Sequence, residues 1–429
     1  MGLDFKGRVT LTILARGLSV GLGLVSSIVT ARFLGPEGRG LLATLSVITG
    51  LAMQFGNPGL HTGNVYFVSR APRRTAGVLG NTLIVSIAAG LLLGAVVAMT
   101  GAIRPGWFRA VPYPLILLTA AVLPFQFMIL LYQNTLLGMQ EVKAFNLFEV
   151  GNKALTFAAL AIYLVALGGG APGAVVLFAA MAVLMGVASA AYCASRVPFR
   201  PVLDRALLRA MLPYGARVYL ACLLAFMVIR SDMLLVNYYL GTGAAGVYSI
   251  AVQIADTLLL VPVTIGMILL PRVAGERPGR GLGVTARVLR HTALLMTLLC
   301  AAAGVLVVPV VRLLYGPGFE AAIVATWCLL PGIWALGLNG VLMNHFAGQG
   351  MPRVTTLTPL AGLVINVSLN VAVIPRFGIK GAAVTSSVAY LLMLAVSLGA
   401  FLRRGEVRLR DSLVVGADDL RLLLGQPGP

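Results

Sequence analysis

The segment Leu34–Gly40 reads LGPEGRG and the segment Leu240–Gly246 reads LGTGAAG, so each starts with Leu-Gly and ends on a glycine at the start of a long apolar run. They lie 206 residues apart, close to half of the 429-residue chain. Two further pairs recur in the same order at nearly this offset: Leu123-Pro124 with Leu330-Pro331, and 170–174 with 378–382. The sequence therefore predicts two similar halves.

The composition places the chain in a membrane. Hydrophobic residues make up 59% of it and charged residues 10%, whereas a soluble globular chain carries roughly 25% charged residues. Apolar runs of about 20 residues separate the charge clusters, which is enough to cross a hydrocarbon core of roughly 30 Å. We expect twelve spans, at 9–33, 41–68, 76–101, 113–137, 144–167, 174–195, 211–236, 246–270, 286–313, 321–347, 355–374 and 380–402.

The fold class predicted from these spans is an all-α polytopic membrane protein of about twelve transmembrane helices. The expected domains are an N-terminal six-helix lobe at 1–200, a C-terminal six-helix lobe at 201–404 and a cytoplasmic tail at 405–429. An even number of spans per half returns the chain to its starting side, so the two lobes are parallel repeats. A membrane chain that repeats itself by halves is typical of a transporter.

The net charge of +19 is mainly a matter of topology. With both termini in the cytoplasm, 21 of the 32 Lys and Arg residues fall in cytoplasmic loops and tails, 7 in external loops and 4 inside spans. This bias is the positive-inside pattern, with contact to anionic lipid headgroups as a secondary consequence. No basic patch is interleaved with aromatic residues, so we expect no nucleic-acid partner. The lysine and arginine before the first span precede no cleavage pattern, which favours a retained anchor in a multi-pass inner-membrane protein.

Ionisable residues inside spans are the candidate functional residues, because burying them in lipid costs several kcal/mol. Arg16 lies roughly 7 Å from the middle of the first span, too deep for easy snorkelling. It is a candidate for gripping an anionic headgroup, or for an ion pair with an acid on another helix. Arg217, near the cytoplasmic end of the seventh span, either has the same role or snorkels.

The seventh and eighth spans carry further charges. Arg230 and Asp232 lie about 160° apart on a regular helix, so they cannot both face one cavity. Asp256 lies near the middle of the eighth span, where a carboxylate is poorly solvated. Asp232 and Asp256 are candidate coupling carboxylates for a proton or sodium ion. The alternative for Asp256 is an interhelical hydrogen bond or a pair with an arginine.

Two other groups are weaker candidates for the cavity. Glu149 and Lys153 are one turn apart with the acid first, which favours an internal ion pair over a substrate contact. Asn57 and Pro58 precede His61 in a Gly-Asn-Pro-Gly segment, where proline removes a backbone hydrogen bond, so the second span is predicted to be kinked or broken there. The scattered His and Cys residues have no metal-ligand spacing, and we expect neither a metal nor a cofactor.

These residues carry a resemblance to a known family. The run 31–40 resembles the first external loop of bacterial oligosaccharide flippases, which belong to the multidrug/oligosaccharidyl-lipid/polysaccharide exporter superfamily. The 230–248 region, with its Asp and a Gly-x-Tyr before the eighth span, is similar to the family pattern, as is the run 378–384. The resemblance implies two lobes around a cationic cavity and a glycan carried on a polyprenyl diphosphate. It implies a non-enzymatic flippase for cell-surface polysaccharide, whose partners are membrane lipids and a polysaccharide polymerase or glycosyltransferases.

Three alternatives stay open. A multidrug cation antiporter of the same superfamily is disfavoured, because it needs acidic residues where Arg16, Arg217 and Arg230 stand. A lipid II flippase shares the basic cavity, but that group usually carries two helices beyond twelve. A membrane glycosyltransferase or polysaccharide ligase needs loop carboxylates for sugar chemistry, and the chain has 13 acidic residues and no Asp-x-Asp.

Overall fold

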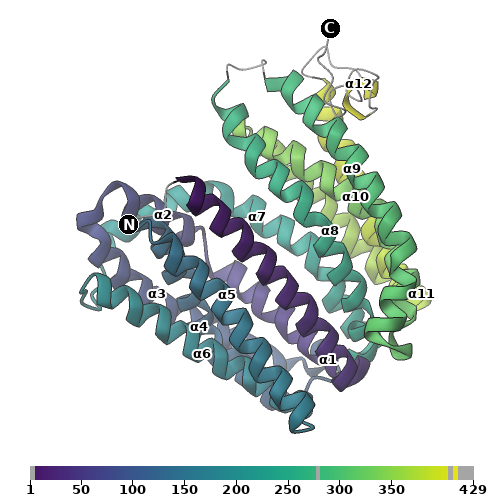
Figure 1. The fold of residues 1–429 in the computed structure, drawn as a ribbon, viewed down its shortest axis with the longest axis horizontal. Coiled ribbons are helices and arrows are strands. Elements are labelled where there is room, and N and C mark those ends of the chain that lie inside the picture. The colour runs from purple at the N-terminus through teal and green to yellow at the C-terminus, as the bar shows by residue number, and fades with distance from the viewer. Residues whose placement is uncertain (1–4, 277–280, 404–408, 414–429) are drawn as a thin grey trace. The chain divides into compact units, whose positions relative to one another are not determined.

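The computed structural model describes residues 5–276, 281–403 and 409–413, and every regular element in these ranges is a helix (Figure 1). Within these ranges, five short 3-10 or π segments connect or end the main helices: η1 (Pro72–Arg74), η2 (Pro105–Phe108), η3 (Ile162–Ala166), η4 (Val311–Tyr315) and η5 (Pro317–Phe319). The main helices are α1 (Phe5–Gly56), α2 (Leu60–Arg70), α3 (Thr75–Ile103), α4 (Tyr113–Gly138), α5 (Val142–Ala161), α6 (Ala171–Arg196), α7 (Arg205–Leu240), α8 (Thr242–Ala274), α9 (Gly281–Val310), α10 (Ala321–Gly348), α11 (Pro352–Leu402) and α12 (Leu409–Leu413).

The predicted all-α polytopic fold is confirmed. Among the described residues, ten helical segments are long and apolar enough to cross a membrane. Two of the ten, in α1 and α11, are about twice the usual length and bend sharply at Gly35 (φ 65°) and Gly378 (φ 63°). Only glycine adopts such a backbone conformation without strain. Helix α11 therefore supplies two of the twelve predicted spans, and α1 supplies the first span and, together with α2, the second.

The chain forms two compact units that share α7. Unit 1 comprises residues 1–226 and 240–246, and unit 2 comprises residues 227–239 and 247–429. The lobe boundary expected between residues 200 and 201 lies in the loop before α7. Of the expected tail, the structure describes α12, which packs against α9, and the rest lies outside the described residues.

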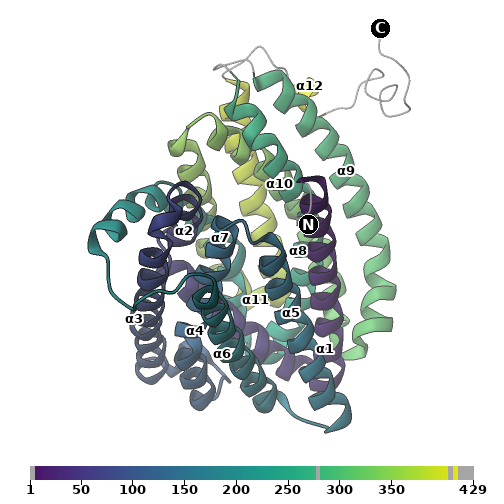
Figure 2. The ribbon, with the colours of Figure 1, turned by 60° about the vertical axis from the view of Figure 1, so that its left-hand side comes forward.

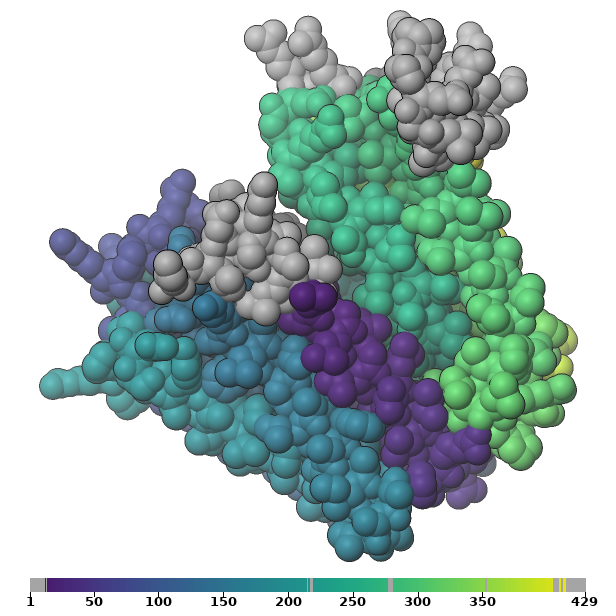
Figure 3. Space-filling view, in the orientation of Figure 1, coloured from purple at the N-terminus to yellow at the C-terminus, as the bar shows by residue number. Residues whose placement is uncertain are grey.

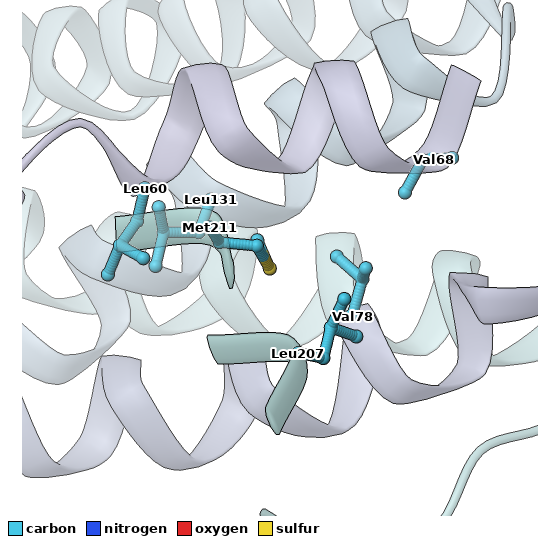
Figure 4. Packing of buried hydrophobic residues seen from close by; sticks show 6 residues of the cluster. All are labelled: Leu60, Val68, Val78, Leu131, Leu207 and Met211. Atoms are coloured by element: carbon cyan, nitrogen blue, oxygen red, sulfur yellow. The ribbon is translucent and has the colours of Figure 1, made fainter. Parts of the chain in front are cut away.

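Unit 1 contains an apolar cluster from four helices (Figure 4). Leu60 and Val68 of α2 pack with Val78 of α3, Leu131 of α4, and Leu207 and Met211 of α7. Between lipid-embedded helices, packing and internal hydrogen bonds replace the hydrophobic effect as the driving force. Accordingly, the buried amide of Asn64 donates to Thr82 Oγ1 at 3.0 Å, to Thr135 Oγ1 at 3.0 Å and to the Leu131 carbonyl at 3.1 Å.

The start of α7 is fixed to α3 by paired hydrogen bonds. The Asn81 amide donates to the Asp204 carbonyl oxygen at 3.0 Å, and the Asp204 N–H donates to Asn81 Oδ1 at 2.8 Å. The Asp204 carboxylate also accepts the Leu207 N–H at 2.9 Å, which caps the first turn of α7. These hydrogen bonds hold the loop between α6 and α7 against α3.

In unit 1, α5 runs beside the first part of α1, as Figures 1 and 2 both show, and the Asn146 amide of α5 donates to Thr12 Oγ1 of α1 at 3.1 Å. Figure 3 shows the side chains of these two helices next to each other on one face of the unit. In unit 2, α10 packs against both α9 and α11.

Each repeated Leu-Gly segment contains a glycine whose φ lies in the left-handed region. Gly35 and Gly241, which occupy equivalent positions, both have positive φ, at 65° and 83°. In unit 1 the two segments also touch: a β-carbon on Gly246 would collide with the Pro36 carbonyl and lie 2.8 Å from the Gly40 nitrogen. Gly40 and Gly246 are themselves 206 residues apart. Equivalent positions of the repeat therefore pack against each other.

Candidate functional site

The most deeply buried carboxylate described in unit 2 is Asp232, on α7, with 2% of its surface exposed. Its Oδ2 accepts a hydrogen bond of 2.6 Å from the Tyr248 hydroxyl of α8 and one of 3.0 Å from Ser386 Oγ of α11. Its Oδ1 accepts the Met233 N–H at 2.7 Å. Three donors thus converge on one carboxylate, as burial of a charged group requires.

The bend in α11 extends this network. Asn366 lies before Gly378 and Ser386 lies after it, and the Asn366 amide donates to Ser386 Oγ at 3.2 Å. Asn366 Oδ1 accepts the Asn370 amide at 3.0 Å and the Ser231 hydroxyl of α7 at 3.3 Å. The hydroxyl of Thr385 donates to Asn370 Oδ1. The positive φ at Gly378 therefore brings two polar helical faces together around Asp232.

Arg230 forms an ion pair with Asp256 across α7 and α8. Its Nη2 lies 2.8 Å from Asp256 Oδ2, and the two side chains are 27% and 32% exposed. The pair with an arginine, which the sequence left open for Asp256, is present in the structure, and a coupling role for Asp256 stays a prediction. A partly accessible pair of this kind can exchange partners more readily than a fully buried one.

A pocket in unit 2 lies between α7, α8, α10 and α11. Its charged and phenolic lining residues are Asp232, Tyr248, Asp256 and Tyr390, while α10 contributes apolar side chains to the lining. Arg230 is not among the residues that line it. This agrees with the helical-wheel argument that Arg230 and Asp232 face different directions. Two carboxylates and two phenol groups favour a proton or a small cation in this pocket.

The three candidate cations occupy different parts of the chain. Arg16 has an exposed side chain on α1 in unit 1, and Arg230 belongs to unit 2. Arg217 lies on the unit 1 part of α7, and its side chain falls outside the described residues. A shared role of the three in gripping a headgroup therefore stays a prediction.

The second span is broken where the sequence predicts a break. Helix α1 ends at Gly56 and α2 begins at Leu60. Asn57 joins the two ends: its Nδ2 lies 2.7 Å from His61 Nδ1, and its Oδ1 accepts the His61 N–H at 3.3 Å. Gly59, with φ of 79°, packs directly on the backbone of Gly215 in α7. Pro58 thus lies in a short, hydrogen-bonded connection.

The expected internal pair of Glu149 and Lys153 is not seen, and a role for either residue stays a prediction. Within the described part of α5 no ion pair joins the two residues, and Lys153 is exposed while Glu149 is half-buried. Exposed pairs gain little energy and must immobilise two long side chains, so correct spacing alone does not make the contact form.

Sequence reasoning missed the uncharged part of the network. Asn366 and Asn370 are four residues apart in an apolar span, which places both amides on one helical face. This spacing of two amides in an apolar span was the sequence signal that could have predicted a polar network here. Ser386 and Tyr390 repeat it on the second arm of α11.

The fold resembles those of solved membrane transporters. The structure of the lipid II flippase MurJ in an inward closed conformation aligns with a TM-score of 0.76 and 14% identity, covering 92% of this chain and 90% of that chain. An inward-facing transporter of the multidrug resistance MATE family aligns with a TM-score of 0.72 and 16% identity, covering 90% of this chain and 94% of that one. At these identities the similarity concerns the fold.

Sequence comparison adds two archaeal relatives. An uncharacterized membrane protein of Methanocaldococcus jannaschii is 25% identical over 198 residues, which cover 45% of this chain and 39% of the relative. A protein of Haloferax volcanii named "Probable flippase AglR" is 25% identical over 185 residues, which cover 40% of this chain and 36% of that protein. The chain thus matches about two-fifths of the length of these relatives. Residues 7–275 match the family described as "Polysaccharide biosynthesis protein".

Proposed function

Because the chain belongs to the polysaccharide biosynthesis protein family, which its match over residues 7–275 establishes, we propose that it is a flippase for a lipid-linked glycan. Its substrate is an oligosaccharide on a polyprenyl diphosphate, which it carries across the cytoplasmic membrane for cell-surface polysaccharide biosynthesis. Like the transporters whose fold it resembles, it changes the side of the substrate without changing its bonds. The family match is the observation that carries this proposal.

The chemistry of the spans supports such a substrate. A diphosphate cannot enter hydrocarbon unaided, whereas a guanidinium grips phosphate oxygens with several N–H donors. Arg230 is a partly exposed cation within a candidate membrane span, so it is placed to meet an anionic headgroup. Arg16 and Arg217 are the other proposed headgroup cations. The polyprenyl tail stays in lipid while the sugar passes through a polar path by alternating access.

The cluster around Asp232 is the proposed site of energy coupling. Asp232 and Asp256 line one pocket together with Tyr248 and Tyr390. A carboxylate in a candidate membrane span is costly unless it is paired, hydrogen-bonded or protonated, which suits an ion-dependent step. We propose that a proton or a sodium ion occupies this pocket during transport.

The broken second span is a further candidate part of the transport path. The connection at Asn57 and Pro58 interrupts the helix and carries His61, and discontinuous helices recur at transport sites. The hydrogen bonds between Asn57 and His61 equally suit a purely structural joint.

We propose that the protein lies in a bacterial cytoplasmic membrane, and the positive-inside charge bias favours both termini inside. The two relatives described above are archaeal. Proposed partners are the surrounding lipids and a polysaccharide polymerase or glycosyltransferases that make and use the substrate.

A lipid II flippase is the second candidate, because the MurJ structure aligns over nine-tenths of both chains with a TM-score of 0.76. Lipid II also carries a diphosphate, so the arginines fit either substrate. A multidrug cation antiporter fits the MATE fold but not the basic residues in the spans.

A host strain that lacks the protein tests the proposal. We expect loss of surface polysaccharide and accumulation of lipid-linked oligosaccharide on the cytoplasmic leaflet, with peptidoglycan synthesis intact. Arg16→Ala at normal protein levels should reproduce part of this defect. Normal surface polymer in the deletion strain would contradict the proposal, and arrested peptidoglycan with accumulated lipid II would favour the second candidate.

A further inference from the structure

The ion pair between Arg230 and Asp256 satisfies only part of each group. One contact joins Nη2 to Oδ2 at 2.8 Å, although a guanidinium has five N–H donors and pairs with a carboxylate most strongly through two parallel bonds. Both side chains remain about 30% exposed, at 27% and 32%. The remaining donors of Arg230 are therefore not committed to Asp256.

Asp256 lies between two environments. On one side it contacts Arg230, which is not among the pocket-lining residues, and on the other it lines the pocket together with Asp232. The charged and phenolic groups that face this pocket are Asp232 from α7, Tyr248 and Asp256 from α8, and Tyr390 from α11, while α10 presents Leu329, Ile333 and Leu336. A cation in the pocket and Arg230 therefore compete for the same carboxylate.

Asp232, by contrast, does not stand between two alternative partners. Its three hydrogen bonds come from Tyr248, Ser386 and Met233, and it is almost fully buried. Its hydrogen-bond partners are fixed, whereas the partner of Asp256 can change. Asp232 therefore keeps its partners, whereas Asp256 can alternate between Arg230 and a cation in the pocket.

We propose that the Arg230–Asp256 pair couples the two ligands of the transporter, so that an anionic headgroup and a small cation each strengthen binding of the other. This rests on the proposed function. A phosphate that engages Arg230 weakens its hold on Asp256, which leaves two carboxylates to attract a cation. A cation that engages Asp256 releases Arg230 for the phosphate. Such linkage is reciprocal, and its usual size is about 5-fold to 150-fold in affinity.

In this proposal each ligand strengthens binding of the other, which distinguishes it from competition of two ligands for one site. Competition for a common site would make the cation weaken binding of the lipid. Here the two ligands take opposite partners of one ion pair, so they bind together. Asp256 acts through Arg230 on the lipid, which makes it a positioning residue.

The experiment uses the full chain in nanodiscs of neutral phosphatidylcholine and undecaprenyl diphosphate as the probe, with undecaprenol as the uncharged control. Affinity is measured in two arms: sodium replacing choline at constant pH and ionic strength, and acidification without sodium. We expect the wild type to bind the diphosphate at least about 5-fold more tightly in one arm, which also identifies the cation. The uncharged alcohol should show no such change.

The variants test the role of the pair. Asp256→Asn should bind the diphosphate without added cation about as tightly as the wild type does with it, and its affinity should ignore the cation. Asp256→Glu should restore the dependence. Glu320→Gln is the matched control, because Glu320 pairs with Arg312 at 3.1 Å in the same unit, away from the pocket, and it should behave as the wild type.

The outcomes separate the two proposals. A wild type that binds the diphosphate no better than the alcohol would overturn both. A wild type that binds it independently of any cation, or more weakly with one, would overturn the coupling alone. The coupling is also overturned if Asp256→Asn keeps the full cation dependence. If that variant does not fold, the wild-type arms and Asp256→Glu still decide the matter.

Discussion

Tyr248 donates a hydrogen bond of 2.6 Å to Asp232, and these two residues join α7 to α8 at the centre of the polar cluster in unit 2. The bond is short because the acceptor is a buried carboxylate. It completes a set of three donors, so the charge of Asp232 is satisfied within the protein. Removing any one of these donors should therefore lower the free energy of unfolding by a measurable amount.

Tyr248→Phe removes one donor and keeps the ring. Because Ser386 and the Met233 N–H remain, we expect the free energy of unfolding to fall by about 1–2 kcal/mol rather than by the cost of an orphaned charge. Thermal unfolding in detergent measures this. Tyr238→Phe, at an exposed position on α7, is the control. Equal stability of the two variants would contradict the geometry described for Asp232.

Asp232→Asn should lower transport more than tenfold. An amide nitrogen would face a donor that now points at a carboxylate oxygen, and the cation pocket would lose one of its two carboxyl groups. Initial flipping rates measured at matched protein levels test this. Glu320→Gln, which removes an exposed carboxylate from the same unit, should leave the rate unchanged. Normal transport by Asp232→Asn would remove Asp232 from the coupling site.

Gly246→Ala should destabilise the protein by about 1–3 kcal/mol, because the added methyl group would overlap the Pro36 backbone where the repeated segments touch. Gly243→Ala lies one turn earlier in α8, where a β-carbon would meet only Glu37 Cγ at an ordinary 3.6 Å. It should be neutral or stabilising, since alanine favours helix. Yields and melting temperatures compare the two, and a tolerated Gly246→Ala would contradict the close contact.

Gly59→Ala tests the break between α1 and α2. The position has φ of 79° and abuts the Gly215 backbone, so alanine is disfavoured both by conformation and by space. We expect a loss of about 1–3 kcal/mol in stability. Gly23→Ala, in a regular part of α1 with nothing within 4 Å, serves as the comparison. If the two variants melt together, the connection is not built as described.

The sequence anticipates the parts of the fold that depend on composition and on glycine. Apolar run lengths predict the twelve spans, and the equivalent turns at Gly35 and Gly241 follow from the repeated Leu-Gly segments. The break at Asn57 and Pro58 follows from the loss of a backbone donor. These features are local, so a single sequence suffices to see them.

The site is harder to predict because it depends on which helices meet. Helical geometry separates Arg230 from Asp232 but does not reveal that Arg230 meets Asp256 on α8. The contribution of Asn366 and Ser386 requires the bend at Gly378, which folds one long helix back on itself. The pair of Glu149 and Lys153 shows the converse, since favourable spacing on one helix produced no contact.

Flipping by purified protein in liposomes tests the central claim most directly. A fluorescent oligosaccharide on undecaprenyl diphosphate is placed in the inner leaflet, and its arrival outside is followed with a membrane-impermeant quencher. The account predicts rapid transfer by the wild type, transfer reduced more than tenfold by Arg230→Gln, and no reduction by Arg312→Gln, whose arginine pairs with Glu320 at an exposed site. Transfer no faster than in protein-free liposomes, or equal transfer by Arg230→Gln, would contradict it.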